Sequence, residues 1–476
     1  MSVLTFKFGG TSMGDADIIK GVAQIILDAQ AEGHQVLTVV SAMTGVTNTL
    51  LNAARAAAEG KTEIYIKATA DLRDRHHETA RELVQDAAAQ EALLAELHRL
   101  IDDFQDLCRS IAVLGEVTNR GLDAVSSIGE RLSARLLAAH LQERGAAALP
   151  VDATTLIVTD DTFQNAAPLM ELTRARVQEQ IVPRLKAGIL PVVTGFIGAT
   201  ENGITTTLGR GGSDYSAAIL ADCVDADELW IWTDVDGVMT TDPRLVPDAR
   251  VIPTLSYREV GELAFFGAKV LHPRTILPVM ERGMPIRVRN TFNPTHPGTL
   301  IQPEPRLTEG TAKAITIIRD VHLITVAGRG MMGVPGIAGR TFTAVARESV
   351  NLLVISQSSS EQSFCFIVPD SDSARAVAAI REELALELER RDVDRVWVQE
   401  DVVIITVVGA GMRSTPGVAA RIFGVLADAG VNVTVIAQGS SESSISLVID
   451  SSDDEAAVRA LHTLVANNGD QASSSA

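Results

Sequence analysis

A glycine-rich stretch near the middle of the chain combines residue types that bind phosphate or carboxylate groups. It runs Thr205-Thr-Thr-Leu-Gly-Arg-Gly-Gly-Ser-Asp214, between an apolar strand candidate with its turn (189–198) and a helical pattern (215–222). Glycines let backbone N–H groups approach a ligand, and a helix N-terminus adds partial positive charge. Arg210 offers a planar fork for a carboxylate or phosphate, while Asp214 could cap the helix or hold an ammonium or metal-bound group. An ordinary glycine loop with an N-cap is the alternative.

Two further polar turns follow strand candidates earlier in the chain. Lys7-Phe-Gly-Gly-Thr-Ser12 ends the run 3–8, and residues 41–47 follow the β-branched run 36–40. Helical patterns come next, at 18–31 and from about residue 48. This alternation is typical of an open α/β sheet, in which ligands gather at the carboxyl ends of the strands. The additional turns therefore favour a ligand-binding role for the central stretch.

A long, charge-rich helical pattern occupies residues 63–117, and we interpret it as a helical insertion packed on the sheet. It contains His76, His77 and His98. Adjacent histidines on a helix face different directions, so we expect solvated surface there rather than a metal site. The next helix opens at Ser126-Ser-Ile-Gly-Glu-Arg131. Its Glu130 is either a first-turn acid favoured by the helix dipole or a ligand for a substrate ammonium.

The strand candidate 228–233 leads into a polar loop, Thr233 to Arg244, that is rich in aspartate. A calcium loop is excluded, because the third oxygen ligand before the glycine and the terminal glutamate are missing. The functional alternative is a loop whose hydroxyls and backbone hold a nucleotide. Lys269 lies beside a glycine, although an arbitrary surface lysine would look the same. Turn residues at 293–305 then mark a domain boundary near residue 305.

Composition narrows the class of protein. The 476 residues carry a net charge of −19, which argues against a nucleic-acid partner because a phosphate-binding surface should be basic. No uninterrupted apolar run approaches about 20 residues, so we expect no membrane span. The first residues lack the features of a signal peptide, and we expect a cytoplasmic protein. Cys108, Cys223 and Cys365 lie far apart, without a metal or disulfide pattern, and are interpreted as small buried residues.

The C-terminal part contains an internal repeat. Residues 321–370 match residues 402–451 without a gap, at an offset of 81 residues. Each copy shows the pattern strand, glycine turn, helix, strand, polar turn, strand and second helix, which predicts two small α+β modules of one fold. The run from Gly328 to Gly333 fits a dinucleotide-binding fingerprint, but the second copy has Ser414 at the third glycine. We therefore interpret it as a turn of the repeat rather than a cofactor site.

Six motifs, in this order along the chain, resemble those of aspartate kinase. They are Lys7-Phe-Gly-Gly-Thr-Ser12, Val40-Ser-Ala42, Ser127-Ile-Gly-Glu-Arg131, Leu208-Gly-Arg-Gly-Gly-Ser-Asp214, Trp232-Thr-Asp-Val-Asp-Gly237 and Phe266-Gly-Ala-Lys-Val-Leu-His-Pro273. The repeat resembles the paired ACT regulatory modules of that family. The resemblance implies an amino-acid kinase fold (an open, mostly parallel sheet flanked by helices) over residues 1–305. Two ferredoxin-like ACT modules would follow, at 306–395 and 396–476. Because no homoserine dehydrogenase domain follows, the chain resembles the monofunctional type.

The resemblance implies transfer of the ATP γ-phosphoryl group to the side-chain carboxylate of L-aspartate, with Mg²⁺ bridging phosphate oxygens. The product would be 4-phospho-L-aspartate, at the first step towards lysine, threonine and methionine. Lys7 would neutralise the transferred phosphoryl group, and Arg210 would clamp the α-carboxylate of the substrate. Glu130 and Asp214 would hold its α-ammonium or order the lysines. The remaining matches are Ser41 and Thr47 for aspartate, and Gly9, Gly10, Thr233, Asp234, Met239, Arg244 and Lys269 for the nucleotide. Met239 departs from the tyrosine that family members often carry.

The ACT resemblance implies regulation by an end-product amino acid bound between subunits. The loops Ile355-Ser-Gln357-Ser-Ser-Ser-Glu361 and Ile436-Ala-Gln438-Gly-Ser-Ser-Glu442 are similar to those of the threonine-responsive branch, whose glutamines contact threonine. Lysine is the alternative effector. The alternative without regulation is that these polar turns only cap strands. The resemblance also implies a homodimer or a larger homo-oligomer. Two other interpretations of the whole chain are a kinase for glutamate or acetylglutamate and an amino-acid sensor without catalysis.

Overall fold

The computed structural model describes residues 2–266, 271, 273–304, 312–412, 415–438 and 443–465. Its contacts divide the chain into two compact units. The first unit comprises residues 2–238, 251–257 and 271–304, and the second comprises residues 239–250, 258–266 and the described residues from 312 onward. Two segments from the first part of the sequence thus belong to the C-terminal unit. Among the described residues, no helix has both the length and the apolar character needed to cross a membrane.

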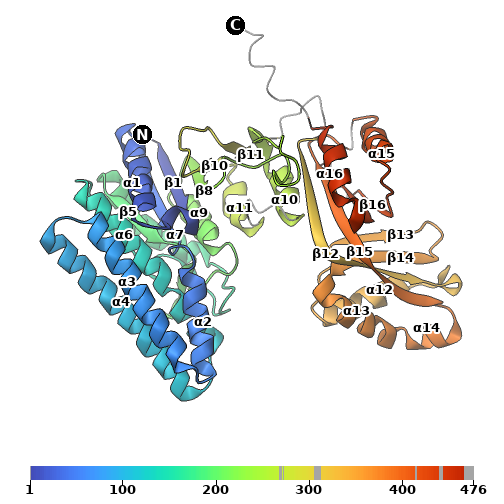
Figure 1. The fold of residues 1–476 in the computed structure, drawn as a ribbon, viewed down its shortest axis with the longest axis horizontal. Helices are drawn as coiled ribbons and strands as arrows, with labels where there is room; N and C mark the ends of the chain where they lie inside the picture. Colours follow the sequence, from blue (N-terminus) through green and yellow to red (C-terminus); the bar gives the residue numbers. More distant parts are fainter. Residues whose placement is uncertain are drawn as a thin grey trace, which may run out of the picture. The chain divides into compact units, whose positions relative to one another are not determined.

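A mostly parallel sheet forms the centre of the first unit, with strand order β3-β5-β2-β1-β8-β10-β11-β9 (Figure 1). The strands are β1 (Val3–Phe8), β2 (Gln35–Val40), β3 (Ala148–Val151), β5 (Leu190–Thr194), β8 (Glu228–Thr233), β9 (Thr254–Ser256), β10 (Ile286–Asn290) and β11 (Thr299–Gln302). All neighbours from β3 to β10 pair in parallel, whereas β11 is antiparallel to β10. The carboxyl ends of these parallel strands therefore lie along one edge of the sheet, as an open α/β sheet requires.

Helices cover both faces of this sheet. Alternation along β1 sends Phe6 and Phe8 to one face, where they share a hydrophobic core with Ile19 and Val22 of α1. The same alternation sends Lys7 to the opposite face, against which α9 packs. The helices of this unit are α1 (Ala16–Ala31), α2 (Val46–Ala58), α3 (Thr62–Leu83), α4 (Ala87–Leu114), α5 (Asn119–Ser126), α6 (Ile128–Glu143), α7 (Met170–Gln180), α8 (Val182–Lys186), α9 (Gly212–Cys223) and α11 (Pro273–Met280).

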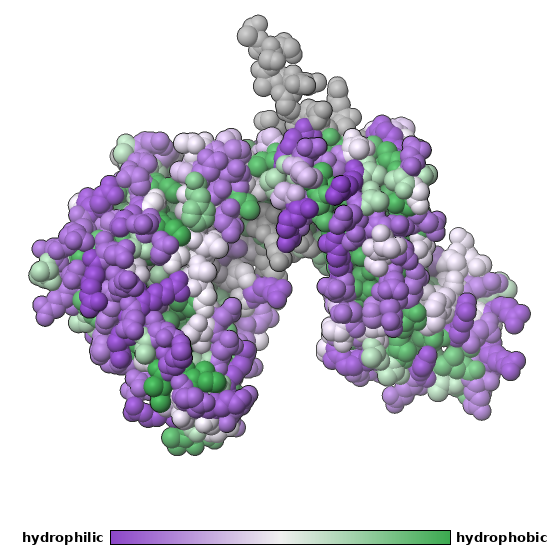
Figure 2. Space-filling view, in the orientation of Figure 1, coloured by the Kyte–Doolittle hydropathy of each residue, from purple (hydrophilic) through white to green (hydrophobic). Residues whose placement is uncertain are grey.

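The helical pattern at 63–117 forms the long hairpin of α3 and α4 (Figure 1). Its main packing partners are α2 and α6, so the predicted packing directly on the sheet is wrong. The hairpin lies one layer further out because α6 already occupies the space next to β3 and β5. Its visible surface is largely hydrophilic (Figure 2), in keeping with the many charged residues of the segment.

A small sheet connects the central strands to the glycine-rich stretch. Its strands are β4 (Val158–Thr159), β6 (Ile197–Thr200) and β7 (Thr205–Thr207), in the order β4-β6-β7. Within it, β7 is antiparallel to β6 and delivers the chain into Leu208 and the N-terminus of α9. The conformation of the glycine-rich loop is therefore set by how firmly β7 is held.

The second unit contains a six-stranded sheet with the order β13-β14-β12-β15-β17-β16. Its strands are β12 (Ala314–Ala327), β13 (Val354–Gln357), β14 (Ser363–Pro369), β15 (Arg395–Val408), β16 (Val435–Ala437) and β17 (Ser444–Asp450), and its helices are α10 (Tyr257–Phe265), α12 (Ile337–Arg347), α13 (Asp370–Glu383), α14 (Ala385–Arg390), α15 (Val418–Asp428) and α16 (Asp454–His462). The predicted repeat of two α+β modules is confirmed. The long strands β12 and β15 pair antiparallel with each other, and Ile315 in the first half of β12 joins the hydrophobic core of the second copy.

Candidate active site

The centre of the candidate site is an ion pair between Lys7 and Asp214. The Nζ atom of Lys7 lies 2.5 Å from Oδ1 of Asp214, and the two side chains are only 12% and 18% exposed. Helix α9 begins after Gly211 and Asp214 lies in its first turn, so Asp214 holds an ammonium instead of capping the helix. Partial burial strengthens the attraction between the charges. The pair therefore fixes a cation at the carboxyl end of β1, beside the N-terminus of α9.

Close backbone approaches bring the surrounding loops together. The N–H of Gly9 donates to the carbonyl of Trp232 at the end of β8, and a Cβ added at Gly9 would lie 3.4 Å from Nζ of Lys7. Gly195, which follows β5, donates to the carbonyl of Val40, and a Cβ there would lie 2.8 Å from Cβ of Ser213. Any side chain at Gly195 would thus push α9 away from the sheet. These glycines let neighbouring backbone segments approach closely around the ion pair.

Glu130 is buried beside the loop that follows β2. Its Oε1 accepts a hydrogen bond from the Ala42 N–H at 3.3 Å, and only 3% of the residue is exposed. Within the described part of the chain, the buried Oε2 has no hydrogen-bond partner. Burial raises the pKa of Glu130 to about 8, against the opposing effect of the Ala42 hydrogen bond. A carboxyl group with an unused buried oxygen is suited to receive a cationic group from a ligand.

The other residues predicted to bind aspartate lie on the same edge of the sheet. Arg210 is exposed on the loop between β7 and α9, where its guanidinium is accessible to a ligand. Ser41 follows β2 directly, and its N–H donates to the carbonyl of Phe8 at 3.0 Å. Thr47 is the second residue of α2 and is partly exposed. The turns after β1 and β2 thus lie at the carboxyl ends of neighbouring parallel strands, while the binding roles of these residues stay predictions.

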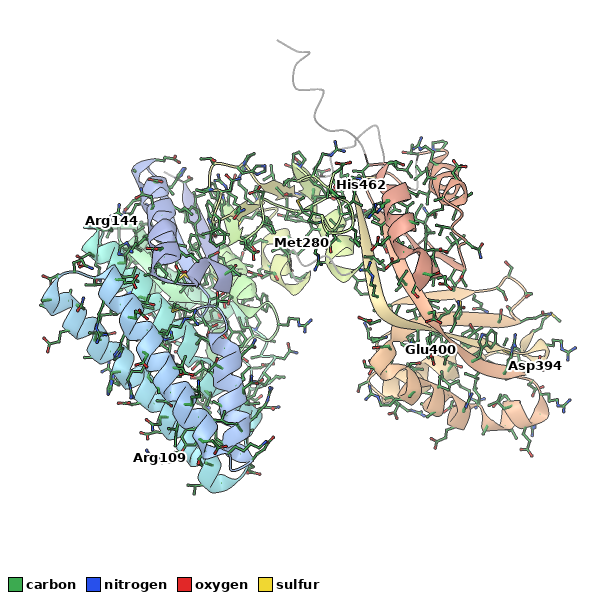
Figure 3. All side chains as sticks on the ribbon, viewed as in Figure 1. Arg109, Arg144, Met280, Asp394, Glu400 and His462 are labelled. Carbon is green, nitrogen blue, oxygen red and sulfur yellow. The ribbon has the colours of Figure 1, made fainter. Side chains whose placement is uncertain are left out.

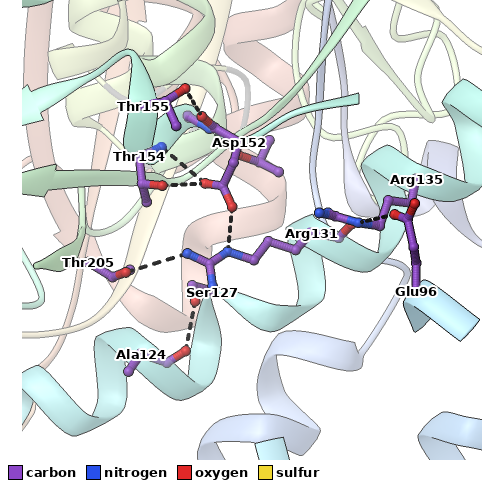
Figure 4. A network of polar contacts seen from close by, with 11 residues as sticks. Glu96, Ala124, Ser127, Arg131, Arg135, Asp152, Thr154, Thr155 and Thr205 are labelled. Atoms are coloured by element: carbon purple, nitrogen blue, oxygen red, sulfur yellow. Dashed lines mark hydrogen bonds and ion pairs between the residues drawn. The ribbon is translucent and has the colours of Figure 1, made fainter. Parts of the chain in front are cut away.

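A polar network behind the site ties α6 to β7 (Figure 4). The Arg131 guanidinium lies 2.7 Å from Oδ2 of Asp152 and reaches the hydroxyl of Thr205 at 3.5 Å. The Ser127 hydroxyl donates to the carbonyl of Ala124 at 2.7 Å. Because Arg131 follows Glu130 directly, the same helical turn contacts both the loop after β2 and the start of β7. Sequence reasoning treated this turn only as the position of Glu130.

The residues predicted to bind a nucleotide are divided between the two units. Thr233 ends β8 and Asp234 follows it in the first unit, where the Thr233 hydroxyl donates to Asp234 at 3.2 Å. Met239 and Arg244 belong to the second unit. There the exposed Arg244 pairs with Asp242 at 2.6 Å, which lowers the pKa of the Asp242 carboxyl. Lys269 lies outside the described residues, so its predicted role stays a prediction.

The histidines of the helical hairpin differ from the expectation of a solvated surface. His76 is fully buried, and burial lowers its pKa to about 4, so the prediction is wrong for this residue. Its ring fills space between packed helices and its Nδ1 contacts the carbonyl of Leu72 at 2.7 Å, while His98 is exposed. In the residues that the structure describes, no group of three or more His, Cys, Asp or Glu side chains is placed to hold a metal ion.

The cysteines are at least partly buried, whereas the two glutamines predicted to bind an effector are exposed. Cys108 and Cys223 are buried, as predicted, and burial raises the pKa of each thiol to about 12. Cys365 is partly buried. Gln357 is exposed at the end of β13, and Gln438 is exposed directly after β16. The two glutamines thus occupy equivalent places in the two copies of the repeat.

Sequence reasoning missed one charged residue close to the glycine-rich stretch. Asp123 of α5 is fully buried and accepts hydrogen bonds from Gln164 and Thr207. A single acid in a helical pattern looks like a solvated surface residue, and its partners lie far along the chain. Asp123 could have been identified only with the knowledge that residues 160–167 pack against residues 205–209.

Comparisons with known proteins agree with this architecture. A model of the amino acid kinase family matches residues 3–290, and an ACT domain model matches residues 324–384 and 405–464. The bifunctional aspartokinase/homoserine dehydrogenase 1 of Zea mays is 39% identical over 96% of this chain and 50% of its own length. Aspartokinase 2 of Arabidopsis thaliana is 34% identical over 96% of this chain and 83% of its own. The chain thus spans about half the length of the bifunctional relatives.

Solved structures extend the similarity to the three-dimensional fold. E. coli aspartokinase III in complex with aspartate and ADP has a TM-score of 0.78 and 31% identity, covering 97% of this chain and 99% of its own. Clostridium acetobutylicum aspartate kinase has a TM-score of 0.81 and 25% identity, covering 97% of this chain and 100% of its own. With its kinase fold, its Lys7–Asp214 site and its paired ACT modules, this chain belongs to the amino acid kinase family and, within it, to the aspartokinases.

Proposed function

We propose that the protein transfers the γ-phosphoryl group of ATP to the side-chain carboxylate of L-aspartate and forms 4-phospho-L-aspartate. The observation that carries the proposal is the ion pair between Lys7 and Asp214 at the carboxyl ends of the parallel strands. It fixes a cation beside the N-terminus of α9, which follows the glycine-rich loop. The similar E. coli aspartokinase III has been solved with aspartate and ADP. This activity is the first step of lysine, threonine and methionine synthesis, and we place it in the cytoplasm.

The proposed aspartate site uses opposite charges for the two ends of the amino acid. Arg210 binds the α-carboxylate through two parallel N–H···O bonds. Glu130 accepts the α-ammonium, whose charge lowers the pKa of Glu130 and keeps it ionised in the complex. Ser41 and Thr47 donate hydroxyl hydrogen bonds from the loop after β2 and the first turn of α2. Held at both ends, the substrate presents its side-chain carboxylate to Lys7.

The proposed chemistry needs positioning and charge neutralisation more than proton transfer. The attacking carboxylate is already ionised near neutral pH, so no general base is required. Asp214 holds Lys7 in place, and Lys7 neutralises charge on the oxygens of the transferred phosphoryl group in the transition state. When bound, ATP supplies the phosphoryl group and Mg²⁺ screens its oxygens. The backbone at Gly9 and Gly10 fits such a group, because a Cβ at either position would lie 3.4 Å from Lys7 Nζ or the Ala42 carbonyl.

The residues proposed to bind the nucleotide are those that match family positions: Gly9, Gly10, Thr233, Asp234, Met239, Arg244 and Lys269. The methionine thioether is polarisable and adaptable, so it can replace the aromatic residue that packs on the adenine or ribose in relatives. Mg²⁺ is held mainly by ATP oxygens and water, which is its usual preference.

We further propose regulation by an end-product amino acid at the ACT modules, with domain boundaries near residues 305 and 395. Threonine is the favoured effector, bound by Gln357 and Gln438 at the interface of a homodimer or a larger homo-oligomer. Lysine is the alternative, and E. coli aspartokinase III has been solved with lysine and aspartate in a T-state. The effector inhibits only if it binds the inactive arrangement more tightly than the active one.

Coupled ADP release with L-aspartate, ATP and Mg²⁺ tests the activity, with L-glutamate and N-acetylglutamate as alternative substrates. ADP release that depends on L-aspartate is expected. ADP release with L-glutamate or N-acetylglutamate, but not with L-aspartate, would overturn the proposal. Lys7→Ala should lower kcat by a factor of 100 or more, roughly the loss expected for one charge-stabilising group. The matched control is Lys20→Ala, because Lys20 is an exposed lysine that pairs with Asp17 on α1. Repeating the assay with threonine, lysine and both identifies the effector.

A further inference from the structure

A buried carboxylate on α5 joins two loops behind the glycine-rich stretch. Asp123 has no solvent exposure. Its Oδ1 accepts the Thr207 hydroxyl at 2.7 Å, and its Oδ2 accepts the Thr207 N–H at 3.1 Å and the Gln164 N–H at 3.1 Å. The Gln164 side-chain amide also donates to Oδ1. Every partner donates its hydrogen bond, so both carboxyl oxygens of Asp123 must act as acceptors.

The two loops that meet at Asp123 also pack on each other. The Ala166 N–H donates to the carbonyl of Thr207 at 2.9 Å. A Cβ added at Gly209 would lie 2.9 Å from Oδ1 of Asn165, so the glycine loop rests directly on this segment. Gln164 itself has a φ of 70°, a left-handed conformation that a non-glycine residue keeps only when its surroundings hold it. Asp123 supplies that restraint by accepting hydrogen bonds from the backbone N–H and the side-chain amide of Gln164.

The position of Asp123 along the chain relates it to Glu130. Thr207 is the last residue of β7, and Arg210 follows three positions later. Glu130 lies on α6, the helix that follows α5 directly, and contacts the loop after β2 through Ala42. Two consecutive helices, which meet at Ser127, therefore contact the loop of Arg210 through Asp123 and the loop of Ala42 through Glu130.

We infer that Asp123 is a positioning residue for substrate binding: it fixes Thr207 and thereby places Arg210 at the distance from Glu130 that matches the two ends of an α-amino acid. The inference rests on the proposed function, since it takes Arg210 as the group that binds the α-carboxylate. Asp123 itself is buried beneath the loop and acts only through Thr207 and Gln164. Loosening it should weaken aspartate binding and leave the nucleotide, held by other loops, largely unaffected.

Steady-state kinetics of Asp123→Asn test the inference. The amide keeps the size of the side chain but turns one acceptor into a donor that faces other N–H groups, so we expect KM for aspartate to rise about tenfold or more. KM for ATP should stay within about twofold. Thr207→Val, which removes only the hydroxyl bond, should have a smaller effect of the same kind, and Thr207→Ser should restore the wild-type value.

The control variant is Thr173→Val, which removes an equally buried hydroxyl of α7 that bonds to the same small sheet. Thr173 bonds to Val158 of β4, at the end of that sheet away from the glycine loop. It should leave KM for aspartate unchanged. Equal increases of KM for aspartate and ATP in Asp123→Asn, or the same aspartate effect in Thr173→Val, would overturn the inference, because both would indicate general loss of structure.

Hydrogen exchange of the full chain without substrate separates this inference from the proposed function. Amides of residues 163–166 and 205–209 should exchange faster in Asp123→Asn than in wild type, with no change at β4. Unchanged exchange in those segments would overturn the inference whatever the enzyme activity. Absence of aspartate-dependent ADP release by the wild-type protein would instead refute the proposed function, while the exchange result would still decide whether Asp123 orders the glycine loop.

Discussion

Two buried glutamates, one in each unit, differ in whether they have a cationic partner. Glu130 in the first unit has an unused oxygen and a pKa of about 8. Glu259 in the second unit lies on α10 and pairs with Lys313, whose Nζ is 2.9 Å from its Oε1; the two side chains are 0% and 2% exposed. A buried charge with a partner contributes to the structure, and losing the partner is costly. A buried carboxyl without a cationic partner costs stability when it ionises, and Glu130 is the group proposed to receive the ammonium of a ligand.

The largest expected effect comes from removing the partner of Glu259. Lys313→Met leaves a carboxylate buried without its cation, and should lower the free energy of unfolding by about 3–5 kcal/mol. Denaturant unfolding at pH 7 measures the change. The control is Lys67→Ala, which removes an exposed pair with Asp71 and should cost less than about 1 kcal/mol. Similar losses for both variants would mean that burial does not distinguish these ion pairs.

Replacing Glu130 should instead raise the free energy of unfolding, by an amount that depends on pH. The folded protein keeps a proton on Glu130 between about pH 4.5 and 8, where the unfolded chain has released it, so this group makes stability fall as pH rises through that window. Glu130→Gln cannot titrate. Relative to wild type, it should therefore gain on the order of 2–4 kcal/mol between pH 4.5 and 8.5 without substrate. Thermal unfolding at the two pH values measures the gain, and a constant difference would contradict it.

The same variant, Glu130→Gln, also tests whether Glu130 takes part in substrate binding. Glu130→Gln removes the charge proposed to bind the α-ammonium of aspartate, so KM for aspartate should rise about tenfold to a hundredfold. Kinetics at pH 8, with ATP saturating, provide the measurement. A variant that is more stable and equally active would show that the buried carboxyl has no part in substrate binding.

A smaller effect is expected where the second unit holds the segment 239–250. The Thr240 hydroxyl accepts the N–H of Arg250 at 3.0 Å and lies 2.9 Å from Nε2 of His462, which is labelled on α16 in Figure 3. Thr240→Val removes both bonds, so we expect a loss of about 1–2 kcal/mol of stability. KM for ATP should rise only if this segment carries the proposed Met239 and Arg244 contacts. Thr463→Val, at an exposed hydroxyl of the same region, is the control.

The effector prediction has the smallest expected effect on the protein itself. Gln357→Ala and Gln438→Ala each remove one exposed amide at equivalent places in the two copies. Either substitution at a true effector site should raise the threonine concentration for half-inhibition by about tenfold. Inhibition curves measured with each variant identify the copy that binds. Unchanged curves for both would remove the glutamines from the effector site.

The predictable parts of the molecule are those that local sequence encodes. Strands β1 and β8 were predicted with the observed ends, because β-branched and aromatic runs are closed by polar turns. The repeat followed from its 81-residue offset. Contacts far apart in sequence were not predictable, because Asp123 and Lys313 look like solvated residues until their distant partners are known. The burial of His76 likewise depends on the helices packed around α3. The assignment of segments 239–250 and 258–266 to the second unit was hidden for the same reason.

The pairing of β12 with β15 has a consequence for any attempt to divide the C-terminal unit. Each strand lends one half to its own copy and the other half to its neighbour: Ile315 lies in the core of the second copy, and Val396 in that of the first. A fragment carrying one copy alone would leave a sheet edge unpaired and a core open, which favours aggregation. The two copies should therefore fold and unfold as one cooperative body, so that a disturbance in either is felt by both.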